Sequence, residues 1–388
     1  MALEAHWHYP TDIRVGAGCL SLITQCCESL NITRALLVTD SQLATFPMVR
    51  QVQDLCQARQ IHCEVFSQIA SDPTDDDVAL GAEKVNKAGS DGIIALGGGA
   101  SLDAAKAIAL SARQTLPLWD MEDVGDNWLR IDTDKILPVI AVPTTAGTGS
   151  EVGRAAVITD LQGQYPKKRI LFHPKLMPLK VLLDPLLTLQ LPPNITAATG
   201  MDALSHLLEA YCSPHFHPMA EGIAVEGIKR IKSYLPIAFE NGDNIEARTQ
   251  MLVASSMGAT AFQRGLGAMH ALAHTLGALY HKHHGLLNAI LMPYVLKHNQ
   301  SAIERKIIYL ATCLEFEHPS FDGVLAWILA MRRRLHIPHT LALIDIDIDD
   351  AKRVGEMAVC DGAAATNPIL LSAKQYTALF IDAVEGRL

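Results

Sequence analysis

Aspartate and histidine residues at helical spacing are the first groups in this sequence that could do chemistry. Asp202 and His206 lie four residues apart, and His270 and His274 repeat the interval farther along the chain. Residues four apart in a helix lie on one face, one turn from each other, so such a pair can bind the same metal ion. The spacing predicts helices that offer ligands to a metal ion.

The local density of histidine supports a metal site. Five of the 16 histidines fall between residues 270 and 284, in a segment otherwise rich in Ala, Leu, Met and Gly. Each histidine alone is more readily explained as a hydrogen-bonded helix residue, but an apolar segment has little reason to bury so many imidazoles. A carboxylate with several imidazoles and no thiolate suits Fe²⁺ or Zn²⁺ in a Lewis-acid role and disfavours a structural zinc finger.

A glycine-rich loop in the first half could bind a phosphate group. It follows the strand-like run 91–96, precedes a helical run from Leu102, and reads Gly97, Gly98, Gly99, Ala100, Ser101. Glycines let the backbone approach a pyrophosphate, and the N–H groups at a helix start attract negative charge. The loop is neither the usual dinucleotide fingerprint nor a Walker A loop, so taken alone it is equally well explained as a structural turn.

Two further features favour a nucleotide. Residues 143–150 form a second loop of small and hydroxylated residues after the strand-like run Val139–Val142, and two loops at the same edge of a sheet favour a ligand over a connector. Asp40 closes another strand-like run, where its carboxylate could accept hydrogen bonds from an adenosine ribose and would repel a 2′-phosphate. Asp40 therefore favours NAD over NADP.

The elements that position these groups change type along the chain. In the first half, apolar runs alternate with amphipathic stretches, which is typical of βα units around a parallel sheet. The predicted strands are Ala35–Thr39, Ile61–Phe66, Gly92–Leu96, Val139–Val142 and Lys180–Leu183, and the predicted helices are Thr45–Arg59, Asp77–Ala88 and Ser101–Ala112. After the break at residues 191–194 the periodicity is helical, as in Ala197–Tyr211. The run 344–350 is expected to be an acidic loop before a helix at Ala351.

We therefore expect two domains, because 388 residues exceed the roughly 100–200 of one ordinary core. Residues 1–190 are expected to form an α/β dinucleotide-binding domain with a Rossmann-like parallel sheet. Residues 191–388 are expected to form an all-α metal-binding and catalytic domain.

Composition narrows the classes of partner and location. The net charge of -9 offers no basic surface for nucleic acid or anionic lipid, which leaves a small molecule as the favoured partner. No stretch reaches the roughly 18 apolar residues needed to span a bilayer, and the first ten residues contain no apolar leader-type run, so a cytoplasmic location is expected. The eight cysteines form no C-x-x-C pair and are expected to be buried, reduced thiols.

Four motifs occur in order along essentially the whole chain. They are residues 97–106 (GGGASLDAAK), 143–152 (PTTAGTGSEV), 200–206 (GMDALSH) and the segment from Gly267 to Pro293. Together they resemble the iron-containing (group III) alcohol dehydrogenase family. The resemblance implies an α/β domain followed by an all-α domain, the architecture shared with dehydroquinate synthase, together with NAD and a metal ion, Fe²⁺ or alternatively Zn²⁺.

The resemblance also implies roles for single residues. The implied metal ligands are Asp202, His206, His270 and His284, and His274 matches a catalytic histidine that lies beside the nicotinamide and relays a proton. His281 and His283 have no family role. The implied cofactor-binding residues are Asp40, Gly97, Gly98, Gly99, Ala100, Ser101, Asp103, Thr144, Thr145, Thr148 and Lys168, with Lys167 as the alternative to Lys168.

The activity implied by the resemblance is that of an NAD(H)-dependent, metal-dependent alcohol dehydrogenase or aldehyde reductase. Its substrate would be a small alcohol or aldehyde, and the chain would form a homodimer or larger homo-oligomer. Three alternatives stay open: a maleylacetate-reductase-like enzyme without the metal, a zinc enzyme similar to glycerol dehydrogenase or dehydroquinate synthase, and a non-catalytic nucleotide-binding protein. Arg264 either faces the pocket, where it could pair with an anionic substrate, or faces solvent at a helix end.

Overall fold

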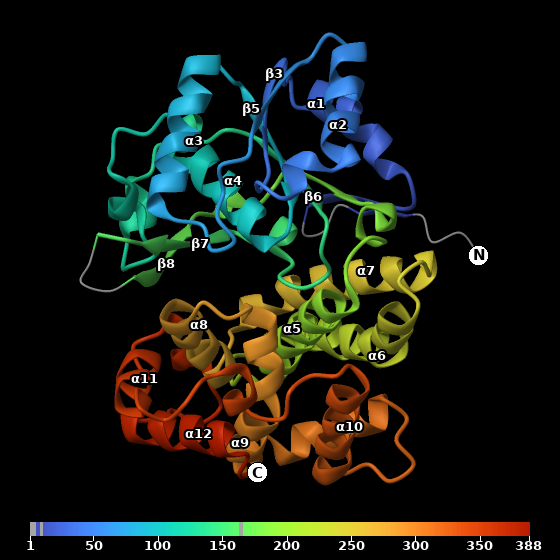
Figure 1. The fold of residues 1–388 in the computed structure, drawn as a ribbon, viewed down its shortest axis with the longest axis vertical. Coiled ribbons are helices and arrows are strands. Elements are labelled where there is room, and N and C mark those ends of the chain that lie inside the picture. The colour runs from blue at the N-terminus through green and yellow to red at the C-terminus, as the bar shows by residue number, and fades with distance from the viewer. Residues whose placement is uncertain (1–4, 8–10, 163–165) are drawn as a thin grey trace. The chain divides into compact units, whose positions relative to one another are not determined.

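The computed structural model describes residues 5–7, 11–162 and 166–388 (Figure 1). The sequence-based expectation of no apolar leader-type run concerns residues 1–10, of which 1–4 and 8–10 lie outside the described residues. The chain divides into two compact units. The first comprises Met1–Thr145 and Gly149–Gln190, and the second comprises Ala146–Thr148 and Leu191–Leu388.

A seven-stranded sheet forms the centre of the first unit, in the order β1-β2-β9-β6-β5-β3-β4. All its neighbouring strands are parallel except β1 and β2, which pair antiparallel. The five predicted strands are all present. The strands are β1 (Ala5–Trp7), β2 (Asp12–Val15), β3 (Arg34–Val38), β4 (His62–Phe66), β5 (Gly92–Gly97), β6 (Val139–Pro143) and β9 (Lys180–Leu183).

Helices cover the sheet because its central strands β5 and β6 are buried and apolar on both faces, as a parallel sheet requires. One core contains Leu37, Leu96 and Val142 from the strands, packed with residues of α1 and α2 such as Val52. Helix α4 contacts β5, β6 and β3 as well as α3. The helices are α1 (Ile23–Ser29), α2 (Pro47–Ala58), α3 (Asp75–Ala88) and α4 (Gly99–Ser111), so the three helices predicted here are confirmed.

Strand register brings the two small-residue loops to one edge of the sheet. Gly97 at the end of β5 is opposite Pro143 at the end of β6, and the N–H of Thr144 donates to the carbonyl oxygen of Gly97 at 3.0 Å. Strand β3 lies between β4 and β5, so the chain reverses its direction of travel across the sheet at the β3/β5 pair. Ligands of open α/β sheets bind outside the carboxyl ends of the strands at such a reversal.

An antiparallel hairpin was not predicted from the sequence. Strands β7 (Ala155–Asp160) and β8 (Lys167–Phe172) form a separate two-stranded sheet in the first unit. Helix α4 and the N-terminal end of α3 contact β7, so the hairpin adds to the packing around the glycine-loop helix.

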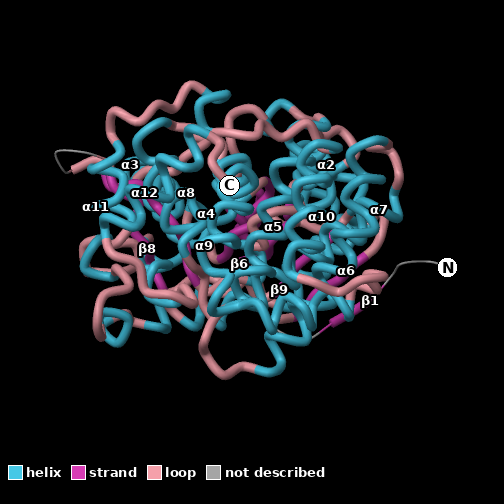
Figure 2. The backbone as a smooth tube through the Cα atoms, turned by 90° about the horizontal axis from the view of Figure 1, so that it is seen from below, coloured by secondary structure: helices cyan, strands magenta, loops and turns pink. Residues whose placement is uncertain are grey.

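The second unit is built from helices, which Figure 2 draws in cyan. Within residues 191–388, all of which the structure describes, no strand occurs. Its α-helices are α5 (Pro193–Cys212), α6 (Pro218–Glu240), α7 (Ile245–Ala261), α8 (Ala268–Tyr280), α9 (His284–Cys313), α10 (Phe321–Arg334), α11 (Ala351–Ala358) and α12 (Ala373–Glu385). Short 3₁₀ turns include η9 (Phe262–Arg264) and η10 (Leu341–Ile344). The fold class predicted from the sequence, an α/β sheet domain followed by helices, is confirmed.

Smaller predictions had mixed outcomes. Residues 345–350 are indeed a loop before α11, and the predicted helix Ala197–Tyr211 lies within α5. All eight cysteines are free thiols, as predicted. The prediction of burial is confirmed for Cys26, Cys27, Cys56 and Cys212, but Cys19, Cys63 and Cys313 are only partly buried and Cys360 is exposed. Within the described residues, no helix combines the length and hydropathy that a membrane span requires.

Candidate metal centre

Helix α5 supplies a carboxylate and an imidazole from one face. Asp202 and His206 are one helical turn apart, and both are buried. Buried polar groups need partners inside the protein, because they have lost those that water provided. Within the described residues, Nδ1 of His206 has no hydrogen-bond partner, which leaves an imidazole nitrogen for which a ligand would compensate.

The start of α9 lies against α5 because residue 285 is glycine. A Cβ on Gly285 would stand 2.4 Å from the carbonyl oxygen of Ala198 and 2.9 Å from Cβ of Asp202, closer than such atoms approach. The absence of a side chain therefore permits the contact. His284 is the first residue of α9, and the close helix contact places its Nε2 3.6 Å from Oδ1 of Asp202.

Donor atoms from α5 and α8 converge in this region. One ligand atom each from Asp202, His206 and His270 lies within 4.8 Å of the other two. The rings of His206 and His270 stack with their centroids 4.6 Å apart. Two ligands on a tetrahedral zinc ion, each about 2.1 Å from it, are roughly 3.4 Å apart. The four implied ligands therefore fit a divalent ion with small side-chain movements, His284 being the most exposed of them.

Asn288 bonds to three of the four implied ligands, a contact that the sequence analysis missed. Its Nδ2 lies 2.9 Å from Oδ1 of Asp202, 3.2 Å from Nε2 of His270 and 3.1 Å from Nε2 of His284. The side chain is fully buried, and its Oδ1 has no partner among the described residues. The amide holds these acceptor atoms together.

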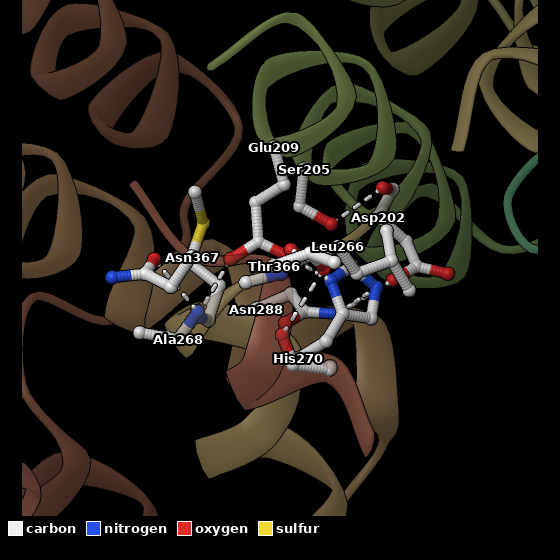
Figure 3. Close-up of polar contacts among 12 residues, drawn as sticks. Asp202, Ser205, Glu209, Leu266, Ala268, His270, Asn288, Thr366 and Asn367 are labelled. Carbon is white, nitrogen blue, oxygen red and sulfur yellow. Dashed lines mark hydrogen bonds and ion pairs between the residues drawn. The ribbon is translucent and has the colours of Figure 1, made fainter. Parts of the chain in front are cut away.

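Glu209 was also missed. Its carboxylate lies at the beginning of α8, where it accepts hydrogen bonds from the backbone N–H groups of Gly267 and Met269 and from Nδ1 of His270 (Figure 3). Burial raises the pKa of Glu209 to about 7, while the N–H donors of Met269 and Gly267 oppose the rise.

The electrostatics of the site favour the forms that bind cations. Burial disfavours ionised Asp202, but the imidazoles of His206, His284 and His270 outweigh burial and lower its pKa to about 2. The pKa of His270 is well below its ordinary value, first because of burial and then because of neighbouring His206. Neutral pH therefore leaves a carboxylate and a neutral imidazole, and metal ligands must be deprotonated in this way.

His274, the predicted catalytic histidine, lies one turn beyond His270 and stacks on His284 with ring centroids 5.2 Å apart. Its Nδ1 is 3.0 Å from Oδ2 of Asp361, a partner that the sequence analysis did not identify. An Nδ1–H donor to the carboxylate leaves Nε2 with a lone pair. His281 and His283 are exposed.

The predicted cofactor loop leads into α4 through a glycine N-cap. Gly97 adopts φ 152°, where glycine is favoured, and Gly98 caps α4 without a side-chain hydrogen bond. Ser101 in the first turn of α4 donates from its hydroxyl to Oδ2 of Asp40 at 3.3 Å, so these two predicted cofactor residues are brought together. The other oxygen of Asp40 accepts the N–H groups of Gln42 and Leu43.

Other predicted cofactor residues have protein partners. Asp103 accepts hydrogen bonds from the Ser150 hydroxyl and the Val157 N–H, and it pairs with buried Lys106 at 3.0 Å. Lys168 pairs with Asp72 at 2.9 Å. Thr144 and Thr145 follow β6 in the first unit, whereas Thr148 belongs to the second.

Arg264 follows neither alternative drawn from the sequence. It is buried, and its guanidinium donates to the carbonyl oxygens of Tyr211 at 2.9 Å and His215 at 2.6 Å. A third contact is the ion pair with Glu221 at 3.1 Å. The two carbonyl groups lie at and just after the carboxyl end of α5, where a cation is favoured, and Glu221 lies in the first turn of α6. Arg264 therefore completes the end of α5 and joins it to α6.

Comparisons with known proteins cover nearly the whole chain. The model of the "Iron-containing alcohol dehydrogenase" family matches residues 10–185, and that of the "Fe-containing alcohol dehydrogenase family, C-terminal" matches residues 196–384. The 4-hydroxybutyrate dehydrogenase of Cupriavidus necator is 38% identical over 377 residues, which cover 95% of this chain and 97% of that protein.

Solved structures have the same fold. A 1,3-propanediol oxidoreductase superposes with a TM-score of 0.90 at 31% identity, covering 95% of this chain and 96% of that one. The sulfoacetaldehyde reductase of Bifidobacterium kashiwanohense, in complex with NAD⁺, superposes with a TM-score of 0.86 at 26% identity, covering 99% of this chain and 98% of that one.

Proposed function

Because the chain belongs to the iron-containing alcohol dehydrogenase family, we propose that it is an NAD(H)- and divalent-metal-dependent alcohol dehydrogenase or aldehyde reductase. Its substrate is a small alcohol or aldehyde. The observation that carries the proposal is the convergence of ligand atoms from Asp202, His206 and His270, with His284 beside Asp202. Fe²⁺ is the proposed ion, with Zn²⁺ as the alternative.

Residues of the second unit would bind the metal ion and transfer the alcohol proton. Asp202, His206, His270 and His284 would hold the ion, and His274 would hold or pass the alcohol proton at Nε2 while Asp361 engages its Nδ1. When bound, the ion would supply Lewis-acid polarisation of the substrate oxygen, and the nicotinamide would accept or donate the hydride.

The residues of the first unit would bind the cofactor. The N–H groups at the start of α4 would bind the pyrophosphate, and Asp40 would accept hydrogen bonds from the adenosine ribose. Thr144, Thr145, Thr148 and Lys168 remain proposed contacts. We also propose that residues 1–190 are the dinucleotide-binding domain and residues 191–388 the metal-binding and catalytic domain.

The test is NADH oxidation by metal-stripped protein reloaded with Fe²⁺, Zn²⁺ or Mn²⁺. The aldehyde panel includes sulfoacetaldehyde and the aldehydes that correspond to 4-hydroxybutyrate and 1,3-propanediol, because relatives are named for these three compounds. We expect His206→Gln to lose bound metal and at least about 100-fold in kcat/KM, since Lewis-acid stabilisation contributes several kcal/mol.

His298→Gln is the matched control, because His298 is an exposed histidine on α9. It should keep both metal and activity. Full turnover by stripped wild-type protein, or by metal-free His206→Gln, would exclude the proposal. A homodimer or larger homo-oligomer and a cytoplasmic location remain expectations, the first measurable by light scattering after size exclusion.

A further inference from the structure

We propose that Glu209 is a positioning residue of the metal centre, which fixes the tautomer of His270 and adds a second negative charge beside the ion. The inference rests on the proposed function, since it needs the metal centre to exist. Glu209 comes from α5, which carries Asp202 and His206, and its carboxylate reaches the start of α8, which carries His270.

The contacts of Glu209 are all with donors. Oε1 accepts the N–H of Met269 at 2.7 Å, and Oε2 accepts the N–H of Gly267 at 2.8 Å. Oε2 also lies 2.6 Å from Nδ1 of His270. Both oxygens already accept backbone N–H groups, and the ionised form of Glu209 can only accept hydrogen bonds, so beside this form the ring proton of His270 lies on Nδ1.

A second, independent contact agrees with that tautomer. The amide nitrogen of Asn288, which can only donate, lies 3.2 Å from Nε2 of His270. Nε2 therefore bears a lone pair on the side where the ligand atoms converge. Metal-binding histidines usually donate their other ring N–H to a carboxylate or carbonyl, which fixes the ring and raises its basicity.

Charge gives Glu209 its second effect. A divalent ion held by one carboxylate and three neutral imidazoles retains a net charge of +1. Asp202, His270 and Glu209 are at most 5% exposed, so an uncompensated charge would be costly here. A bound divalent cation would favour the ionised form of Glu209, and that form would bring the cluster to neutrality through His270.

Helix capping is the competing explanation, and the chain offers a control for it. Gly267, the cap residue of α8, has no side chain, and the N–H of Ala268 is capped instead by Oδ1 of Asn367 at 3.1 Å (Figure 3). If Glu209 served only to cap α8, then removing the Asn367 cap should affect metal binding to a similar degree.

The experiment measures Zn²⁺ affinity of the full chain by competition with a chelating dye, and the visible spectrum of the Co²⁺ form. Glu209→Gln keeps the shape but loses the charge, so we expect 10–100-fold weaker binding and an altered Co²⁺ spectrum. Asn367→Ala should lower the melting temperature but hold Zn²⁺ within about threefold of wild type. Glu221→Gln, which removes another partly buried carboxylate of the same unit, should behave likewise.

Equal affinities of wild type and Glu209→Gln, or an equal loss in Asn367→Ala, would overturn the role of Glu209 alone. A wild-type chain that binds no divalent ion would overturn the metal centre itself, and this proposal with it. Should Glu209→Gln not fold, long-range ¹H–¹⁵N spectra of wild-type histidines decide the matter. His270 must show a protonated Nδ1, and a protonated Nε2 would overturn the proposal.

Discussion

At the scale of single residues, helical spacing predicted the ligand-bearing positions but not their partners. Asp202 and His206 are recognisable because four residues separate them on one helix. Asn288 and Glu209 stand at similar intervals from His284 and His206, so the signal was present, but amides and glutamates at helical spacing are common on helices. Asp361 is 87 residues from its partner His274, and only the packing of the second unit brings them together.

The charge of Asp40 should set the choice between NADH and NADPH. Its carboxylate already accepts the hydroxyl of Ser101 beside the glycine loop, where a 2′-phosphate would meet a like charge. We expect Asp40→Asn to raise kcat/KM for NADPH about tenfold and to lower it for NADH, as steady-state kinetics with both cofactors will measure. An unchanged NADH/NADPH ratio would place the ribose elsewhere.

Arg264 should affect stability and not the choice of substrate. Its buried guanidinium donates from Nε and Nη1 to carbonyl oxygens and pairs with Glu221, so its charge is already compensated inside the protein. Arg264→Leu should lower the melting temperature by about 5–10 °C, because it leaves those acceptors unpaired. The ratio of kcat/KM for a carboxylated and an uncharged aldehyde should stay as in wild type. A selective loss with the carboxylated substrate would contradict this assignment.

At the scale of elements, β3, β5, β6 and β9 were predictable because each contains an uninterrupted apolar run. The β7–β8 hairpin was not, since Lys167, Lys168 and Arg169 begin β8 and give it a polar sequence. Its cohesion comes from pairing and from ion pairs such as that of Arg169 with Asp160 at 2.8 Å. Strand β2 was missed because charged residues, Asp12 and Arg14, alternate with its two apolar residues, and it gains its place by pairing with distant β9.

The contact between α5 and α9 should control metal affinity through Gly285. A methyl group there would collide with the carbonyl oxygen of Ala198, so Gly285→Ala should push the start of α9 and His284 away from Asp202. We expect Zn²⁺ affinity to fall at least about tenfold. Gly222→Ala in α6 is the matched control, because nothing lies within 4 Å of its added Cβ, and it should leave Zn²⁺ affinity unchanged. Equal affinities of the two variants would show that α9 accommodates the methyl group.

Glu221 in α6 pairs with Lys306 of α9 and Arg264 of η9. The stability that these pairs contribute should depend on pH, because they lower the pKa of Glu221. Burial opposes its ionisation, but hydrogen bonds from Lys306 and Arg264 outweigh burial and lower the pKa below 4.5. A carboxyl group whose pKa is lower folded than unfolded contributes stability above its unfolded pKa and loses it as the pH falls through the folded pKa. Glu221→Gln should therefore melt earlier than wild type at pH 7, with the gap closing below pH 4.5. Thermal scans showing a constant gap from pH 7 to pH 3 would contradict this.

At the scale of the whole molecule, the two compact units carry different parts of the proposed chemistry. The glycine loop and Asp40 belong to the first unit, and all four implied metal ligands belong to the second. The composition change near residue 190 is visible in the sequence because a parallel sheet needs β-branched runs, whereas the helices need Ala, Leu and Met. The distances between site residues that are far apart in the sequence depend on tertiary packing, which no local sequence pattern encodes.

Each ligand should therefore protect its own unit first in hydrogen exchange. A ligand that binds the native state suppresses the local openings through which buried amides exchange. Adding Zn²⁺ to stripped protein should slow exchange most in α5, the start of α8 and the start of α9, because these segments carry the ligands. Adding NAD⁺ alone should slow it most at the end of β5 and the first turn of α4. His206→Gln should abolish the first pattern and keep the second, because His206 contributes only to the metal centre. Protection of the glycine loop by Zn²⁺ alone, equal to that of α5, would show that the metal acts elsewhere than at the four converging side chains.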